Sequence, residues 1–229
     1  MANFNESSAS ISLKCWNPEQ VPTLLPVRRQ IDCHDQQCVK FKGVGVFHSR
    51  AQLLYSAIME GTASVIHYVP RPFTFNAFGR RYTPSFFVNE NNHKYVRELG
   101  SRPCGNAEWL AAVEKYCDFN SHTFEVIPSE WVFERQQLAE NWLTIVRMLA
   151  RNADHFTEPI EQLILLDYLS PDGSSFGDLV RLTKTDNKHF VELAVLRLVH
   201  RGVISTDLQH RHLSYDTEMK LCTSPGKRV

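Results

Sequence analysis

Apolar and polar residues alternate over several short stretches in the first half of the chain, which predicts β-strands separated by a helix. Alternation over 39–47 indicates a strand or a hairpin. Ser49 is in position to cap a helix that runs to about Met59, and Gly61 would end it. Four more strand patterns follow, divided by turns rich in Gly and Asn: 64–68, 73–78, 82–88 and 94–99.

Helices and strands continue to alternate after these patterns. Helical spacing predicts helices over 106–116 and 133–149, and alternation predicts a strand over 123–127. Elements in this order are typical of an α/β layer arrangement. We therefore expect a mixed sheet flanked by helices over residues 25–152, preceded by a flexible polar arm over 1–24.

A smaller second unit is predicted over residues 158–222, followed by a frayed tail over 223–229. Three short helices followed by a two-stranded wing are typical of a winged helix-turn-helix domain. The patterns that predict these elements are helical over 160–169, 176–182 and from Asn187 to a stop at Gly202, and alternating over 203–208 and 212–215.

Charge and cysteine content narrow the range of functions. The 229 residues include 25 Lys or Arg and 25 Asp or Glu. This balance argues against a free-standing domain that binds DNA tightly without specificity, because such domains are usually basic. No apolar run approaches the length that spans a bilayer. The six cysteines are sparse for this length, so reduced thiols and a cytoplasmic location are expected.

The most informative residues lie on two of the predicted strands. One strand carries Tyr82-Thr83-Pro84-Ser85-Phe86 and the next ends in Glu98-Leu99-Gly100, a layout similar to the catalytic hairpin of metal-dependent DNA endonucleases. With Phe47-His48-Ser49-Arg50-Ala51-Gln52 and Arg71-Pro72-Phe73 before them, these segments resemble the TnsA family, the endonuclease subunit of heteromeric bacterial transposases. The resemblance covers roughly residues 25 to 222.

The resemblance implies both a fold and a set of partners. The first domain is expected to resemble restriction endonucleases, and the second a winged-helix domain. Expected partners are transposon-end DNA, a TnsB-like DDE transposase and a TnsC-like AAA+ ATPase. The protein would then act in the bacterial cytoplasm, and on the nucleoid when assembled.

Most of the residues that would perform the chemistry are replaced. The family's catalytic Glu, Asp and Lys positions hold Gln52, Ser85 and Gly100, and Glu98 is the acidic residue that remains. Magnesium needs hard, charged oxygen ligands beside the scissile phosphate. We therefore expect an endonuclease fold that does not cleave DNA and uses no cofactor, with Glu98 as a weak candidate for residual metal binding.

Three alternatives remain open. Glu60, Glu98 and Lys94 could form a relocated magnesium site, which would make the protein an active endonuclease that cuts 5′ strands at transposon ends. Cys33 and Cys38 could begin a zinc site, although no second ligand pair is apparent. The chain could also be a nuclease-derived, DNA-binding regulator outside transposition.

Basic residues are the expected DNA contacts, because phosphate contacts can persist after cleavage is lost. The predicted recognition helix of the second domain is nearly balanced in charge, which favours a protein partner for that domain. The candidate DNA-binding residues are Arg28, Arg29, Lys40, Lys42, Arg50, Arg80, Arg81 and Arg97 in the first domain, and Lys188 and Arg211 in the second.

Overall fold

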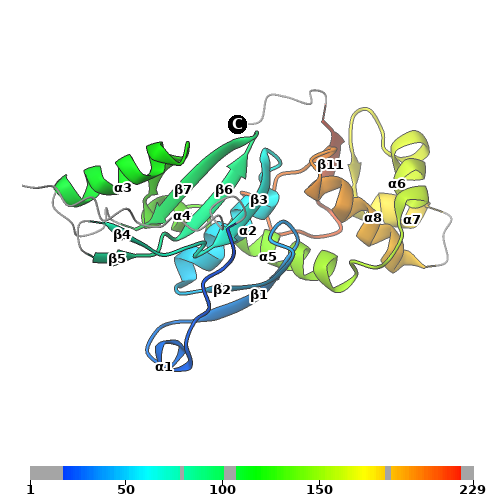
Figure 1. The fold of residues 1–229 in the computed structure, drawn as a ribbon. Coiled ribbons are helices and arrows are strands. Elements are labelled where there is room, and N and C mark those ends of the chain that lie inside the picture. The colour runs from blue at the N-terminus through cyan, green and yellow to red at the C-terminus, as the bar shows by residue number, and fades with distance from the viewer. Residues whose placement is uncertain (1–17, 78–79, 101–106, 184–186, 223–229) are drawn as a thin grey trace, which may run out of the picture.

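The computed structural model of the protein describes residues 18–77, 80–100, 107–183 and 187–222. Figure 1 shows a mixed sheet with helices around it, followed by a smaller, mainly helical region that ends in β11. The predicted arm is thus described only from residue 18 onward, and the predicted tail over 223–229 lies outside the described residues.

Most elements of the first region lie close to where the sequence pattern predicts them. In chain order the elements are α1 (Leu25–Arg28), β1 (His34–Cys38), β2 (Gly43–Phe47), α2 (Arg50–Gly61), β3 (Val65–Pro70), β4 (Phe75–Ala77), β5 (Arg80–Tyr82), β6 (Phe86–Glu90), β7 (His93–Leu99), α3 (Ala107–Phe119), β8 (Thr123–Ile127), α4 (Ser129–Phe133) and α5 (Gln136–Arg151). However, α1 and α4 were not predicted, and the hairpin predicted over 39–47 begins earlier, at His34.

The central sheet has four strands in the order β3-β6-β7-β8. β6 pairs antiparallel with both β3 and β7, whereas β8 pairs parallel with β7. A parallel neighbour needs a crossover connection, and α3 supplies it. Phe86 lies opposite Arg97, and Leu99 lies opposite Ile127, so the start of β6 and the ends of β7 and β8 meet at one end of the sheet.

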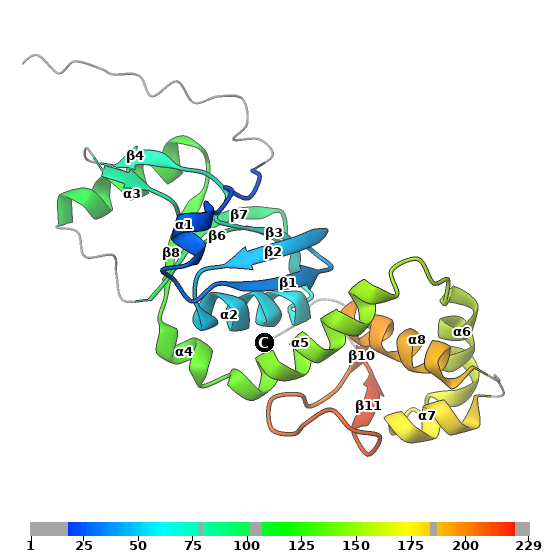
Figure 2. The same ribbon diagram turned by 90° about the horizontal axis from the view of Figure 1, so that it is seen from below.

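α2 and α5 pack against each other beside the antiparallel β1–β2 hairpin (Figure 2). The close approach depends on a glycine. A Cβ atom added to Gly61 would lie 2.0 Å from the indole ring of Trp142. The N-terminal end of α2 is capped as predicted, because the Ser49 hydroxyl accepts a hydrogen bond from the Gln52 backbone N–H.

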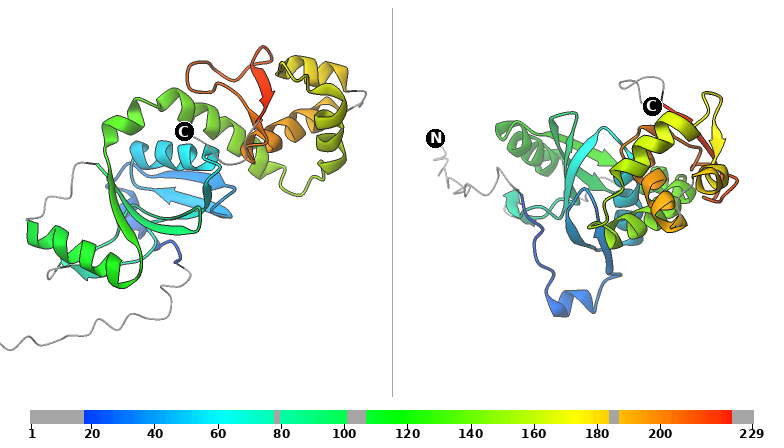
Figure 3. Two further views of the ribbon diagram at one scale, coloured as in Figure 1. Left: turned by 90° about the horizontal axis from the view of Figure 1, so that it is seen from above. Right: turned by 90° about the vertical axis from the view of Figure 1, so that its right-hand side faces the viewer.

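The second region begins after α5. Its elements are α6 (Glu158–Leu163), the π-helical turn η2 (Ile164–Tyr168), β9 (Ser174–Ser175), α7 (Phe176–Leu182), α8 (Lys188–His200), β10 (Ile204–Ser205) and β11 (Glu218–Leu221). The three short strands form an antiparallel sheet in the order β10-β11-β9. Figure 3 shows β11, in red, beside the helices of this region.

α5 joins the two regions through a shared core. It contacts α2 on one side and α8 on the other. One continuous cluster of buried residues extends from Phe47 in β2, through Ile145 in α5, to Met219 in β11. The boundary predicted between 152 and 158 therefore lies in a connection, while the apolar core runs across it.

Local signals placed several elements correctly. The predicted strand over 123–127 and the predicted helix over 176–182, with Ser175 as its cap, are confirmed. The pattern over 82–88 is split, because Pro84 has no N–H for a sheet: β5 ends at Tyr82 and β6 begins at Phe86. The helix predicted over 133–149 corresponds to α5, which begins at Gln136, and the short helix α4 precedes it.

The prediction of a strand over 212–215 is wrong, and the second strand of the hairpin is β11. The side chain of Asn141 on α5 explains the difference. Its amide nitrogen donates to the Arg211 carbonyl at 2.7 Å, and its amide oxygen accepts from the Leu213 N–H at 3.0 Å. A buried side chain thus satisfies backbone groups that a strand would otherwise pair.

Among the residues described, none of the helices combines the length and the apolar character that crossing a membrane requires.

Candidate functional site

Three of the four residues that the resemblance singles out come together at one end of the central sheet. Gln52 lies in the first turn of α2, Ser85 directly precedes β6, and Glu98 lies near the end of β7. The Ser85 hydroxyl donates to Glu98 Oε1 at 2.9 Å, and Gln52 Nε2 lies 3.4 Å from Ser85 Oγ. We call Gln52, Ser85 and Glu98 the Glu98 cluster.

The Glu98 carboxylate is enclosed by donors from its own protein. The Tyr82 hydroxyl donates to Oε2 at 2.6 Å, and the Ser85 N–H donates to the same oxygen at 3.1 Å. The Leu99 N–H in turn donates to Ser85 Oγ at 3.1 Å. Burial raises the pKa of Glu98, although the hydrogen bonds from Tyr82 and Ser85 offset part of that rise. Burial and the adjacent carboxylate also raise the pKa of Tyr82.

The local sequence explains how Gln52 enters this cluster. Ser49 and Gln52 form a cap related to the capping box, in which the third residue of the helix bonds back to the chain before it. The Gln52 backbone N–H donates to Ser49 Oγ at 3.2 Å, and Gln52 Oε1 accepts from the His48 N–H at 2.8 Å. The amide oxygen is therefore already engaged, and the amide nitrogen faces Ser85.

Gly100 lies just after β7 and takes no part in this hydrogen bonding through a side chain. Its φ of +114° is a conformation that favours glycine, and its N–H donates to the Ile127 carbonyl at 3.0 Å. A Cβ atom there would meet only Ser129 Oγ, at 3.9 Å. There is space for a side chain, but the backbone conformation would strain a lysine at this position.

This donor set does not fit a magnesium site. One carboxylate, one hydroxyl and one amide supply a single negative charge, whereas magnesium in such sites is held by several hard, charged oxygens. In the portions of the chain that the structure describes, no three His, Cys, Asp or Glu side chains are grouped to hold a metal ion. The arrangement can orient polar groups, but its residues do not suit metal-assisted hydrolysis.

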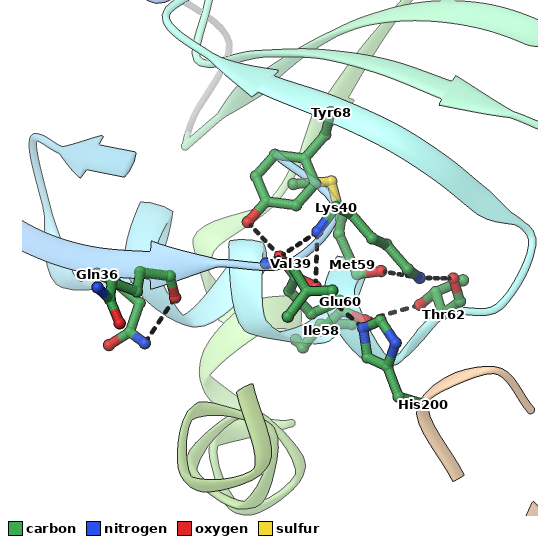
Figure 4. Close-up of polar contacts among 10 residues, drawn as sticks. Gln36, Val39, Lys40, Ile58, Met59, Glu60, Thr62, Tyr68 and His200 are labelled. Carbon is green, nitrogen blue, oxygen red and sulfur yellow. Dashed lines mark hydrogen bonds and ion pairs between the residues drawn. The ribbon is translucent and has the colours of Figure 1, made fainter. Parts of the chain in front are cut away.

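Glu60, one of the three residues of the relocated site, is engaged elsewhere in the fold. Glu60 lies two turns along α2 from Gln52, a rise of about 12 Å. Figure 4 shows its carboxylate surrounded by other groups. It accepts from the Val39 N–H at 2.9 Å, from the Tyr68 hydroxyl at 3.1 Å, and lies 3.1 Å from His200 Nε2. None of these partners belongs to the Glu98 cluster.

Cys33 and Cys38, the cysteines of the alternative zinc site, are both free thiols. Cys38 is buried in β1, where its Sγ lies 3.3 Å from the Gln36 carbonyl. Burial raises the pKa of Cys38 to about 11, and among the described residues no group of three His, Cys, Asp or Glu side chains forms around it.

Several of the candidate DNA-binding residues are engaged within the protein. Arg97 lies between Glu90 and Glu125, at 2.7 Å from each, and its side chain is only 11% exposed. Lys40 Nζ donates to the Met59 and Thr62 carbonyls at the end of α2, at 3.0 and 2.6 Å. Both residues therefore stabilise the fold from the inside.

The other candidates lie at or near the surface. Arg28 pairs with Asp35, Arg50 lies 3.3 Å from Glu140, and Lys188 Nζ donates to the Thr183 carbonyl at 2.9 Å. The side chain of Arg80, on β5, lies outside the described residues. The remaining exposed candidates are Arg29, Lys42, Arg81 and Arg211.

Sequence reasoning missed a polar group that adjoins the Glu98 cluster. Arg71 Nη1 lies 2.8 Å from Thr23 Oγ1 and 2.5 Å from His48 Nε2, and Thr23 Oγ1 lies 2.7 Å from the same histidine nitrogen. Burial, and then the positive charges of Arg71 and Arg28, lower the pKa of His48 to about 4. The sequence shows Arg71 only as part of the Arg71-Pro72-Phe73 segment, because its partner Thr23 lies 48 residues away in the chain.

A cavity of about 750 Å³ lies away from the Glu98 cluster, where the β1–β2 hairpin meets α5 and α8. Its lining includes both acidic and basic side chains, such as Glu161 and Arg201, which pair with each other. None of the residues of the Glu98 cluster lines this cavity.

Comparison with known proteins adds no assignment. A scan against protein-family models and a search of curated proteins both found no match to this chain.

Proposed function

We propose that the chain is a TnsA-like subunit of a bacterial transposition complex, a pseudo-endonuclease that binds transposon ends without cutting them. Its role would be architectural: the first region holds DNA, and the second docks on a TnsB-like DDE transposase or a TnsC-like AAA+ ATPase. DNA binding and docking on a partner would together order the assembly of the active complex.

The meeting of Gln52, Ser85 and Glu98 carries this proposal. Gln52 lies 33 positions before Ser85, and Ser85 lies 13 positions before Glu98. The three nevertheless form one hydrogen-bonded cluster at the end of a mixed sheet. This convergence is what a restriction-endonuclease-like fold would require of the corresponding catalytic positions. The replacement of charged groups by an amide and a hydroxyl supports a scaffold that has lost cleavage.

The second region supports a role in binding. Its three short helices and three-stranded sheet fit a winged-helix domain. On α8, Arg197 donates to the Asn152 carbonyl at 2.9 Å and to Thr157 Oγ1 at 2.6 Å, so this cation stabilises the connection to α5. A cation that is engaged in this way is not available to DNA. The predicted recognition helix is therefore better suited to docking on a protein than to reading a DNA groove.

A nicking assay tests the proposal. Purified protein, alone and with its transposase and ATPase partners, would be incubated with supercoiled DNA carrying transposon ends and with magnesium or manganese. We expect retention of transposon-end DNA in a mobility-shift assay and no metal-dependent nicking by this subunit. Glu98→Ala serves as the control, since it should leave DNA retention unchanged.

Metal-dependent nicking that Glu98→Ala abolishes would contradict the proposal and identify an active endonuclease. Failure to retain transposon ends in the presence or absence of the partners would contradict the DNA-binding part. Retention of DNA without any effect of the transposase or the ATPase would favour a DNA-binding regulator outside transposition.

A further inference from the structure

Arg71 is a half-buried cation with no acidic partner among the described residues. Arg97 in β7, which is also largely buried, is paired with two carboxylates, those of Glu90 and Glu125. Removing a cation from water without a counter-ion is unfavourable, so such a position is typically compensated. The described residues therefore leave the charge of Arg71 available to an anionic ligand.

The hydrogen bonds of Arg71 leave one edge of its guanidinium group available. Nη1 is held by Thr23 Oγ1 and by His48 Nε2. The described residues provide no acceptor for Nε or Nη2, and these two donors form the planar edge that binds two oxygens of one phosphate or carboxylate. The contacts of Nη1 fix the direction of this edge.

The backbone at Arg71 is held in a strained conformation. Its φ is +47°, a left-handed conformation that is rare for a bulky residue, and Pro72 follows it. Hydrogen bonds hold the chain on both sides: Arg71 N–H donates to the Ser85 carbonyl at 2.9 Å, and Val21 N–H donates to the Arg71 carbonyl at 2.8 Å. Strain that persists in this way is concentrated at functional sites.

The surroundings of Arg71 favour an anion. His48 Nε2 can accept from Nη1 when the imidazole is neutral with its proton on Nδ1, and the lowered pKa of His48 favours the neutral form. Arg28 lies close enough for its charge to act on His48, and it is partly balanced by Asp35. The group also adjoins the Glu98 cluster, because the His48 N–H donates to Gln52 Oε1 at 2.8 Å.

We propose that Arg71, oriented by Thr23 and His48, binds a phosphate of the DNA backbone beside the Glu98 cluster. A phosphodiester offers two oxygens to the Nε–Nη2 edge, and it carries the negative charge that no described residue provides for Arg71. The identity of the polymer as DNA rests on the proposed function, whereas the phosphate chemistry rests on Arg71 alone.

Fluorescence anisotropy with a labelled transposon-end duplex tests this site, using the full chain at low salt. We expect Arg71→Gln to weaken binding about tenfold or more, and Arg71→Lys to weaken it less. The slope of the logarithm of the binding constant against the logarithm of the salt concentration should be shallower for Arg71→Gln, by the share of about one phosphate contact. Arg147→Gln is the matched control, because it removes the same charge from an exposed position on α5 and should change binding less than about twofold. Equal affinity of Arg71→Gln and wild type would overturn the site.

Arg71→Gly separates binding from folding. Glycine adopts a φ of +47° readily, so the melting temperature should stay the same or rise while DNA binding falls as in Arg71→Gln. Full DNA binding by Arg71→Gly would show that the guanidinium is not the ligand.

Thermal shift with inorganic phosphate distinguishes failure of this site from failure of the proposed function. We expect phosphate to raise the melting temperature of wild type more than that of Arg71→Gln. This result without any DNA binding would retain the anion site and overturn the role at DNA ends. DNA binding that is insensitive to Arg71 would retain that role and overturn the site, and the absence of both effects would overturn the site as well.

Discussion

His200 Nε2 and Glu60 Oε2 lie 3.1 Å apart in the interior, and they join the two regions of the chain. His200 is near the end of α8, and Glu60 is near the end of α2. The side chain of Glu60 is only 2% exposed, and that of His200 is 9% exposed. The pair therefore makes the docking of the second region depend on a buried polar contact as well as on apolar packing.

Glu60→Ala is expected to lower the free energy of unfolding by about 3–5 kcal/mol, because removal of one member of a buried polar group leaves the others unsatisfied. The groups left without an acceptor would include the Val39 and Lys40 N–H groups and the Tyr68 hydroxyl. Urea unfolding followed by tryptophan fluorescence measures the change. The exposed Glu114→Ala is the control, with an expected change below about 0.5 kcal/mol, and a similar small effect for Glu60→Ala would contradict the prediction.

His48 is expected to titrate near pH 4 in the folded protein, since its pKa is lowered from an ordinary value of 6.5 to about 4. The unfolded chain takes up the proton first as pH falls. The contribution of His48 to stability is therefore complete above pH 6.5 and is lost as pH falls toward 4. NMR of the imidazole signals gives the midpoint. Arg71→Gln should raise it, because one of the repelling charges is removed, and an unchanged midpoint would contradict the contact between the two side chains.

Ser85→Asp is expected to destabilise the protein by roughly 1–3 kcal/mol in the absence of divalent metal, because it buries a second carboxylate against Glu98. Millimolar magnesium should recover part of this loss, since two adjacent carboxylates begin to form a magnesium site. The melting temperature with and without magnesium measures both effects. Ser85→Asn matches the size without the charge and should not respond to magnesium. An equal response by wild type would show that the present donor set already binds the metal.

Gly61→Ala is expected to destabilise the protein by about 1–3 kcal/mol, although alanine favours a helix over glycine by roughly 1 kcal/mol. The reason is the contact with Trp142, which lies 2.0 Å from where the new Cβ atom would be. Chemical unfolding of both single variants and of the double variant with Trp142→Phe measures the coupling. The smaller ring should relieve the clash, so the double variant should be more stable than the sum of the single changes predicts. Strict additivity would argue against the clash.

The sequence carried enough local information to place most helices and strands. Ser49 and Ser175 cap their helices through hydrogen bonds to residues three positions later, and such contacts depend on nearby residues alone. The alternation over 123–127 also has a local origin, because successive side chains of a strand point to opposite faces. The resemblance on the segments around Gln52, Ser85 and Glu98 likewise needed only the order of residues.

Tertiary structure decided which of these residues meet and what each charge does. The sequence pointed to Arg97 as a DNA contact, although two glutamates enclose it, and did not point to Arg71, which has no acidic partner among the described residues. Nor did it show that Asn141 would replace a strand partner for the segment after Arg211. These outcomes depend on contacts between residues far apart in the chain, and on how much water each polar group loses when the core closes around it. The local pattern of apolar and polar positions specifies neither these long-range contacts nor the loss of water at each polar group.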